Sequence, residues 1–185
     1  MFFWVFFCVF LGRFGSGNPF FELLGPVGSR SHPQILIFVD FRSETGPPGT
    51  FGHHYYNVFA ATSPSPIWYD LYKQLRTIVR EYIGTEDPLW FQSWLNFHKP
   101  DQVLDWHDHN WPYHGYISID PKGTRTVFKD YEVKNEIGNI YIGPGHRRHK
   151  VEVDEVYDGP RITLGFDIHT EPSKPFDQWS LLPLI

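Results

Sequence analysis

The sequence is nearly without cysteine: Cys8 is the single one among 185 residues. No disulfide can therefore form within the chain, and a zinc site built on several thiolates is excluded. Because disulfides are typical of oxidising compartments, this absence favours a reducing setting, and we expect a cytoplasmic protein.

An excess of positive charge is also missing. Lys and Arg total 16 against 21 Asp and Glu, which gives a formal net charge of −5. Proteins that bind nucleic acid carry clusters of basic side chains that neutralise phosphates, and here only the stretch from Arg147 to Lys150 is locally basic. The composition gives no sign of a nucleic-acid partner, and nothing in it indicates an oligomeric state.

No apolar run is long enough to cross a membrane. The longest, residues 1–12 (MFFWVFFCVFLG), falls short of the roughly 20 residues that a spanning helix needs. A degenerate secretion signal and a peripheral anchor are both open, but no positive charge precedes the run and no good cleavage site follows it. We favour an extension outside the fold over residues 1–33, with one domain over 34–185 and no membrane contact.

What the chain does have is enough apolar and aromatic material for one core, with 41% hydrophobic and 18% aromatic residues. Apolar residues at three- and four-residue steps predict a helix over 66–84, with Pro66 suited to its first turn and Gly84 to its end. Short strand patterns separated by turn residues are expected at 34–41, 88–98, 113–119, 124–128, 135–143, 149–153 and 161–168. One helix backing many short strands indicates a mainly β fold, a sandwich or jelly roll.

Histidines gather in the stretch WHDHNWPYHGYISI (106–119). In an extended chain, residues two apart project to the same side, so His107 and His109 can converge on one metal ion while Asp108 points away. A third ligand must come from another strand, and His149 opens one directly after a Gly-Pro-Gly turn. The pair alone is more often ordinary surface or core histidine, so a metal site needs further support.

The remaining histidines have weaker claims on a metal. His114 is expected to pack beside Tyr113 and Tyr116 rather than to bind an ion. The lesser metal candidates are His98 and His146, and loop or surface positions are expected for His32, His53, His54 and His169.

A cation and a hydroxyl follow on the last long strand. Arg161 and Thr163 share one face of it, together with Asp167, while Ile162 and alternate residues up to Ile168 share the other. A buried guanidinium needs an anion, and arginine binds a carboxylate through two parallel hydrogen bonds to which a neighbouring hydroxyl can add another. The alternative is a salt bridge within the protein, for example to Asp167 or Glu152.

In this order the residues resemble the iron(II)- and 2-oxoglutarate-dependent oxygenases. Three stretches are similar to small oxygenase-like proteins of phage and marine bacteria: SWLNFHKPDQVLDWHDHNWPYHGYISI, IGPGHRRHKVEV and GPRITLGFDI. The resemblance implies a double-stranded β-helix of jelly-roll, cupin-like type, with His107 and His149 as iron ligands and with Arg161 and Thr163 holding the far carboxylate of 2-oxoglutarate. Where the family carries Asp or Glu, this chain has His109, which gives a three-histidine set; Asp105 is the other possible carboxylate ligand.

The resemblance further implies the cofactor Fe(II), the co-substrate 2-oxoglutarate and dioxygen, and hydroxylation of a C–H bond in an unidentified substrate, expected to be a small molecule. The aromatic residues Trp106, Trp111, Tyr113 and Tyr116 could shape a dry pocket, and the loop 41–66 could act as a lid. Two other functions remain open: a cupin-like three-histidine metalloenzyme without 2-oxoglutarate, and a non-enzymatic jelly-roll protein for binding or structure.

Overall fold

The structure, a computed structural model, describes residues 56–102, 104–171 and 180–184. The expected strand at 34–41, the segment 1–33 and most of the 41–66 loop lie outside these residues. Within the described part, no helix is both long enough and apolar enough to span a membrane.

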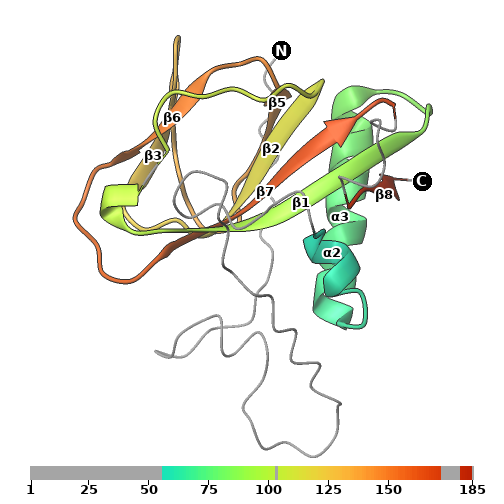
Figure 1. Ribbon diagram of the computed structural model, residues 1–185, viewed down its shortest axis with the longest axis horizontal. Helices are drawn as coiled ribbons and strands as arrows, with labels where there is room; N and C mark the ends of the chain where they lie inside the picture. Colours follow the sequence, from blue (N-terminus) through green and yellow to red (C-terminus); the bar gives the residue numbers. More distant parts are fainter. Residues whose placement is uncertain (1–55, 103, 172–179, 185) are drawn as a thin grey trace, which may run out of the picture.

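The described strands form two antiparallel sheets (Figure 1). The larger has the order β5-β2-β7-β1-β8, and the smaller has the order β4-β3-β6. Their bounds are β1 Leu89–His98, β2 Tyr113–Asp120, β3 Thr124–Phe128, β4 Glu132–Lys134, β5 Ile140–Pro144, β6 His149–Val153, β7 Arg161–His169 and β8 Leu182–Leu184.

The chain passes repeatedly between the two sheets. After β1 in the larger sheet, it reaches the smaller one, where His107 pairs with His149 of β6 in an isolated antiparallel bridge. It returns to the larger sheet at β2, crosses again for β3 and β4, and alternates through β5, β6 and β7. This winding of paired strands is the double-stranded β-helix, so the predicted fold class is confirmed.

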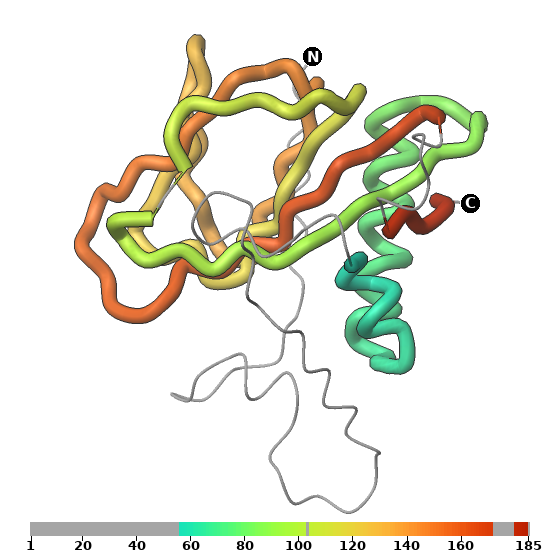
Figure 2. Tube along the Cα trace, viewed as in Figure 1, coloured from blue at the N-terminus to red at the C-terminus, as the bar shows by residue number. Residues whose placement is uncertain are grey.

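Helix α3 (Pro66–Ile83) packs against one face of the larger sheet. It has proline in its first turn and ends at Gly84, whose φ of 69° is left-handed, as glycine readily allows. The helix predicted over 66–84 is therefore confirmed. Its side chains Leu75 and Val79 join strand residues in the main apolar cluster, and Figures 1 and 2 show α3 at one end of β1 and β7, with β3 and β6 at the other.

Strand β7 separates this apolar cluster from a polar interior. Leu164, Phe166 and Ile168 belong to the cluster, as the predicted alternation requires. The other face of β7 carries Arg161 and Asp167, and yet every residue of the strand is buried. The second face therefore looks into the space between the two sheets, where polar side chains are enclosed.

Four elements differ from the sequence prediction. The strand expected at 135–143 begins only at Ile140, because Gly138 takes a positive φ of 84° and its N–H donates to the Ser118 carbonyl in a turn. Helix α2 (Val58–Ala61) and strands β4 and β8 were not predicted. Elements of three or four residues are too short to show a periodic pattern.

Candidate metal centre

The structure brings His107, His109 and His149 together. One ring nitrogen from each lies within 4.8 Å of those of the other two. Backbone hydrogen bonds fix the two segments that carry them: the His107 N–H donates to the His149 carbonyl at 3.0 Å, the reverse bond is 2.9 Å, and the His109 N–H donates to the Gly145 carbonyl at 2.9 Å. Strand pairing alone therefore places residues about 40 apart in one cluster.

Each of the three rings is held through its Nδ1 atom. The partner is the Asp105 carbonyl for His107 at 2.7 Å, and the Arg147 carbonyl for His149 at 3.1 Å. For His109 the partner is the Asp167 carboxylate at 2.9 Å. A histidine that donates from Nδ1 presents the lone pair of Nε2, which is the usual arrangement around a protein-bound metal.

The His109 Nε2 atom is the clearest sign that this cluster fits a cation. It is buried and has no hydrogen-bond partner among the described residues. An unsatisfied buried lone pair costs free energy. The imidazoles of His107 and His149 converge on the His109 ring nitrogen. The three residues therefore suit a metal ion bound through nitrogen.

Burial keeps His107 and His149 in the form that binds metals. It lowers the pKa of His107 from its ordinary value, and it lowers the pKa of His149 to about 2, with nearby imidazoles adding to the effect. Both rings are therefore neutral at pH 7. Neutral imidazole has the free lone pair that coordination requires, so no proton has to leave before a metal binds.

Asp167, considered from the sequence only as a counter-ion for Arg161, has a different role in the site. Its Oδ1 atom accepts from Nδ1 of both His109 and His114, the latter at 3.2 Å. Burial by itself raises the pKa of Asp167, but the hydrogen bonds from His109 and His114 outweigh it and hold the pKa well below its ordinary value. The carboxylate is therefore ionised and orients the His109 ring. Its place on the face of Arg161 and Thr163 was the signal that could have revealed it.

His114 supports His109 instead of packing against tyrosines as expected. Its ring stacks on the His109 ring with 3.5 Å between centroids. His109, His114 and Asp167 also form a second group of close ligand atoms. In that group both contacts to the carboxylate have the lengths of hydrogen bonds, so we assign it to holding His109 in place.

Asp105 does not turn its carboxylate toward the cluster. That carboxylate accepts from the Trp106 N–H at 2.7 Å, and Asp105 belongs to neither group of converging ligand atoms. Its carbonyl oxygen is the atom that matters, because it holds His107. The geometry therefore favours the three-histidine set over the alternative with Asp105.

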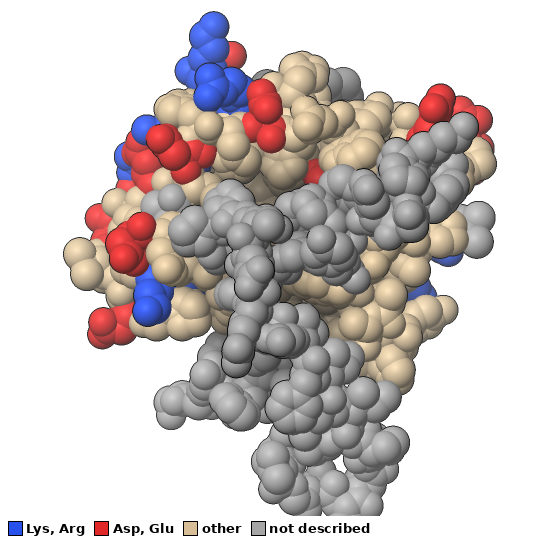
Figure 3. Space-filling model, viewed as in Figure 1, with Lys and Arg blue, Asp and Glu red and all other residues tan. Residues whose placement is uncertain are grey.

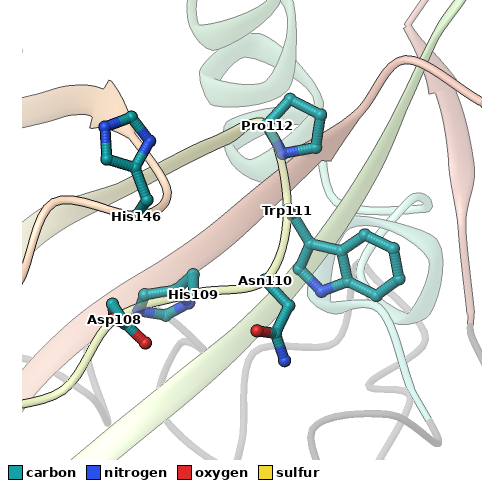
Figure 4. A pocket seen from close by; sticks show the side chains of 6 residues that line it. All are labelled: Asp108, His109, Asn110, Trp111, Pro112 and His146. Carbon is teal, nitrogen blue, oxygen red and sulfur yellow. The ribbon is translucent and has the colours of Figure 1, made fainter.

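A pocket of about 440 Å³ opens beside His109. Figure 4 shows Asp108 next to His109, and His146 of the β5–β6 turn on the opposite side from Asn110. The full lining is Asp108, His109, Asn110, Trp111, Pro112 and His146. A small molecule placed in this pocket would lie against the imidazole of a candidate ligand.

Arg161 is a buried cation without a carboxylate partner among the described residues. It is 3% exposed, and its Nε donates to the Thr124 hydroxyl at 3.3 Å. Asp167 is engaged by His109 and His114, and Glu152 pairs with Lys150 at 2.6 Å and with Arg125. The salt bridge considered as the alternative is therefore absent from this part of the chain.

Thr163 lies next to Arg161 on the same inner face. Its hydroxyl oxygen accepts from the Asn96 amide at 3.2 Å, so its own O–H can still donate. Thr124 and Asn96, which position the two predicted residues, were not identified from the sequence. Nothing in single-sequence spacing links either of them to β7.

Several aromatic and histidine residues around the site lie in other positions than the sequence predicted. Of the four aromatic residues, only Trp111 lines the pocket, whereas Trp106 is exposed and lies under the Lys150 ammonium. The expectation that His169 is a surface residue is wrong: it is buried at the end of β7, where its ring stacks on Trp111 at 3.7 Å. The positions 32, 53 and 54 lie outside the described residues.

The surface view shows acidic and basic side chains side by side (Figure 3). On the described surface of that face, Lys and Arg form no continuous stripe. The mixture of signs agrees with the formal net charge of −5.

No protein-family model matches the chain, and no curated protein matches it. Several solved structures are similar. A cupin-2 domain protein from Shewanella frigidimarina is 20% identical over 45% of this chain and 72% of its own, with a TM-score of 0.33. An RmlC-like cupin protein from Desulfovibrio desulfuricans is 16% identical over 42% and 71%, with a TM-score of 0.34.

A cupin domain from Bordetella pertussis is 15% identical over 45% of this chain and 84% of its own, with a TM-score of 0.32. Similarities this distant carry no argument about function. The chemistry of the site is therefore inferred from its own geometry. The chain forms a cupin-like double-stranded β-helix that carries a candidate three-histidine metal site.

Proposed function

We propose that this protein is a non-haem iron(II)- and 2-oxoglutarate-dependent dioxygenase that hydroxylates a small molecule. The observation that carries the proposal is Arg161, a buried guanidinium with no described carboxylate partner, enclosed by the same two sheets as the histidine cluster. A buried charge without a counter-ion is costly, so the interior is built to receive an anion. A dicarboxylate that also reaches the metal fits this demand.

His107, His109 and His149 would hold the iron through Nε2, which leaves three of six octahedral positions for other ligands. When bound, iron(II) supplies the activation of dioxygen. Three neutral ligands leave the centre one unit more positive than a set with one carboxylate. Asp167 supplies a negative charge behind His109. Its carboxylate accepts a hydrogen bond from His109 Nδ1, which would make that imidazole a better electron donor to the metal.

The remaining residues bind and enclose the reactants. Arg161 would hold the far carboxylate of 2-oxoglutarate in two parallel hydrogen bonds, and the Thr163 O–H would donate a third. The prime substrate would enter the pocket beside His109, where Trp111 limits access of water. The single cysteine supports a reducing compartment, and we place the reaction in the cytoplasm.

A second candidate is a cupin-like metalloenzyme that does not use 2-oxoglutarate. The absence of a carboxylate from the candidate ligand set favours it, since the described cluster contains three histidines and nothing acidic. In that case Arg161 would bind a carboxylate of the substrate itself.

Visible absorption under anaerobic conditions separates the two candidates. Iron(II) is added to the purified protein, followed by 2-oxoglutarate, and we expect a metal-to-ligand charge-transfer band only when both are present. The band should be lost in His149→Ala and weakened in Arg161→Ala. Arg148→Ala, an exposed arginine next to His149, is the matched control and should leave it unchanged.

Two other outcomes of this titration would contradict the first candidate. If iron binds and 2-oxoglutarate leaves the spectrum unchanged, the second candidate replaces the first. If neither binds, the histidines are structural and the protein is not a metalloenzyme of this kind.

A further inference from the structure

One more histidine in the polar interior, His98, has no structural explanation. His98, at the end of β1, is fully buried at 0% exposure. Both of its ring nitrogens are buried and have no hydrogen-bond partner among the described residues. Buried imidazoles are normally hydrogen-bonded, because leaving such a group unpaired costs roughly 1–3 kcal/mol. A buried imidazole without a partner among the described residues indicates that a ligand supplies the missing hydrogen bond.

Strand pairing places His98 beside Arg161. The two residues are directly opposite each other in the β1–β7 ladder, and Asn96 is opposite Thr163 in the same register. Opposite residues of an antiparallel pair point to the same face, with Cβ atoms about 5 Å apart. Asn96 and Thr163 are hydrogen-bonded on this face, and Asp167 on the same face of β7 contacts His109, so the face is the inner one.

The charge and protonation of His98 suit an anion that is already bound to Arg161. Burial, together with the positive charge of the nearby Arg161, lowers the pKa of His98 to about 4. The ring is therefore neutral at pH 7 and keeps one N–H to donate. No carboxylate of the described residues lies within 4.0 Å of either His98 or Arg161.

We propose that His98 is a second anchor for the far carboxylate of 2-oxoglutarate, donating one N–H to an oxygen of the carboxylate that Arg161 holds. The inference rests on the proposed function. A single carboxylate can bridge the two residues, because they lie directly opposite each other on neighbouring strands. His98 would thereby favour oxo acids that carry a second carboxylate over those that end in a methyl group.

The test measures binding instead of turnover. The full-length protein is loaded with Zn(II), which is stable in air, and titrated by calorimetry with 2-oxoglutarate and with 2-oxopentanoate. The second acid has the same chain length and lacks the far carboxylate. His98→Phe keeps a ring of similar size without a hydrogen bond, and His98→Gln keeps a donor.

We expect His98→Phe to weaken 2-oxoglutarate binding roughly 10- to 100-fold, as for loss of a hydrogen bond to a charged group. Its affinity for 2-oxopentanoate should change by less than about threefold, and His98→Gln should recover part of the loss. His169→Phe is the matched control, because it removes an equally buried imidazole at the opposite end of the same β1–β7 ladder. It should leave both affinities unchanged.

Two results would overturn the inference while leaving the proposed function standing: unchanged 2-oxoglutarate affinity in His98→Phe, or equal weakening of both acids. Failure of the unmodified protein to bind 2-oxoglutarate would instead overturn the proposed function. A second measurement does not depend on a folded variant. In ¹⁵N-histidine-labelled protein, 2-oxoglutarate should shift the His98 ring resonances, and 2-oxopentanoate should shift them less.

Discussion

Replacing Asp167 by asparagine tests whether the site is held by its buried carboxylate. The side chain keeps its shape and loses its charge, so the bonds from His109 at 2.9 Å and His114 at 3.2 Å lose their ionic acceptor. The asparagine amide can also turn its NH₂ group toward His109 and favour the wrong tautomer, with the proton on Nε2. Either change weakens the ring as a metal ligand.

The size of the effect follows from the position of Asp167 directly behind a candidate ligand. Loss of such a partner typically weakens metal binding 10- to 100-fold, or about 1.4–2.7 kcal/mol. We therefore expect Asp167→Asn to bind Fe(II) and Zn(II) more weakly by this factor, measured by competition with a chromophoric chelator. Thermal melting would establish that the variant is folded.

Asp108→Asn is the matched control, because it removes an exposed carboxylate one residue away from His109. It should change the metal affinity by less than about threefold, since surface charges are screened by solvent. If Asp167→Asn bound metal as tightly as the unmodified protein, the assignment of Asp167 as the residue that orients His109 would be refuted.

Two further predictions concern stability. The pKa of His98 and of His114 is about 4 in the folded protein against an ordinary 6.5, so the unfolded chain binds more protons below pH 6.5. The free energy of unfolding of the metal-free protein should therefore be constant above about pH 7 and fall as the pH decreases from 6.5 to 4, as urea denaturation at several pH values would show; a flat profile would contradict this. Gly145→Ala should lower stability by about 1–3 kcal/mol and also weaken metal binding, because a Cβ atom would meet the Trp111 and His109 carbonyls of the segment that carries His109. Chemical denaturation and the chelator assay would measure the two effects, and unchanged values in both would show that this close approach does not matter.

The long periodic elements could be predicted because their local patterns agree with their tertiary surroundings. Helix α3 carries both its apolar stripe and its end signals in the sequence, and the two-residue alternation of β7 survives in the structure. The spacing of His107 and His109 likewise determined that both rings could point one way. The motif order also singled out His149 and Arg161.

Only the tertiary structure decided which of these residues have partners. Asp167 and Glu152 were equally acceptable counter-ions for Arg161 in the sequence, but strand register gives the first to His109 and His114, and Lys150 and Arg125 take the second. Sequence spacing cannot reveal such assignments, because cross-strand contacts join residues many positions apart. His98 shows this most clearly: its own neighbours in the sequence say little, and its position opposite Arg161 exists only once β1 pairs with β7.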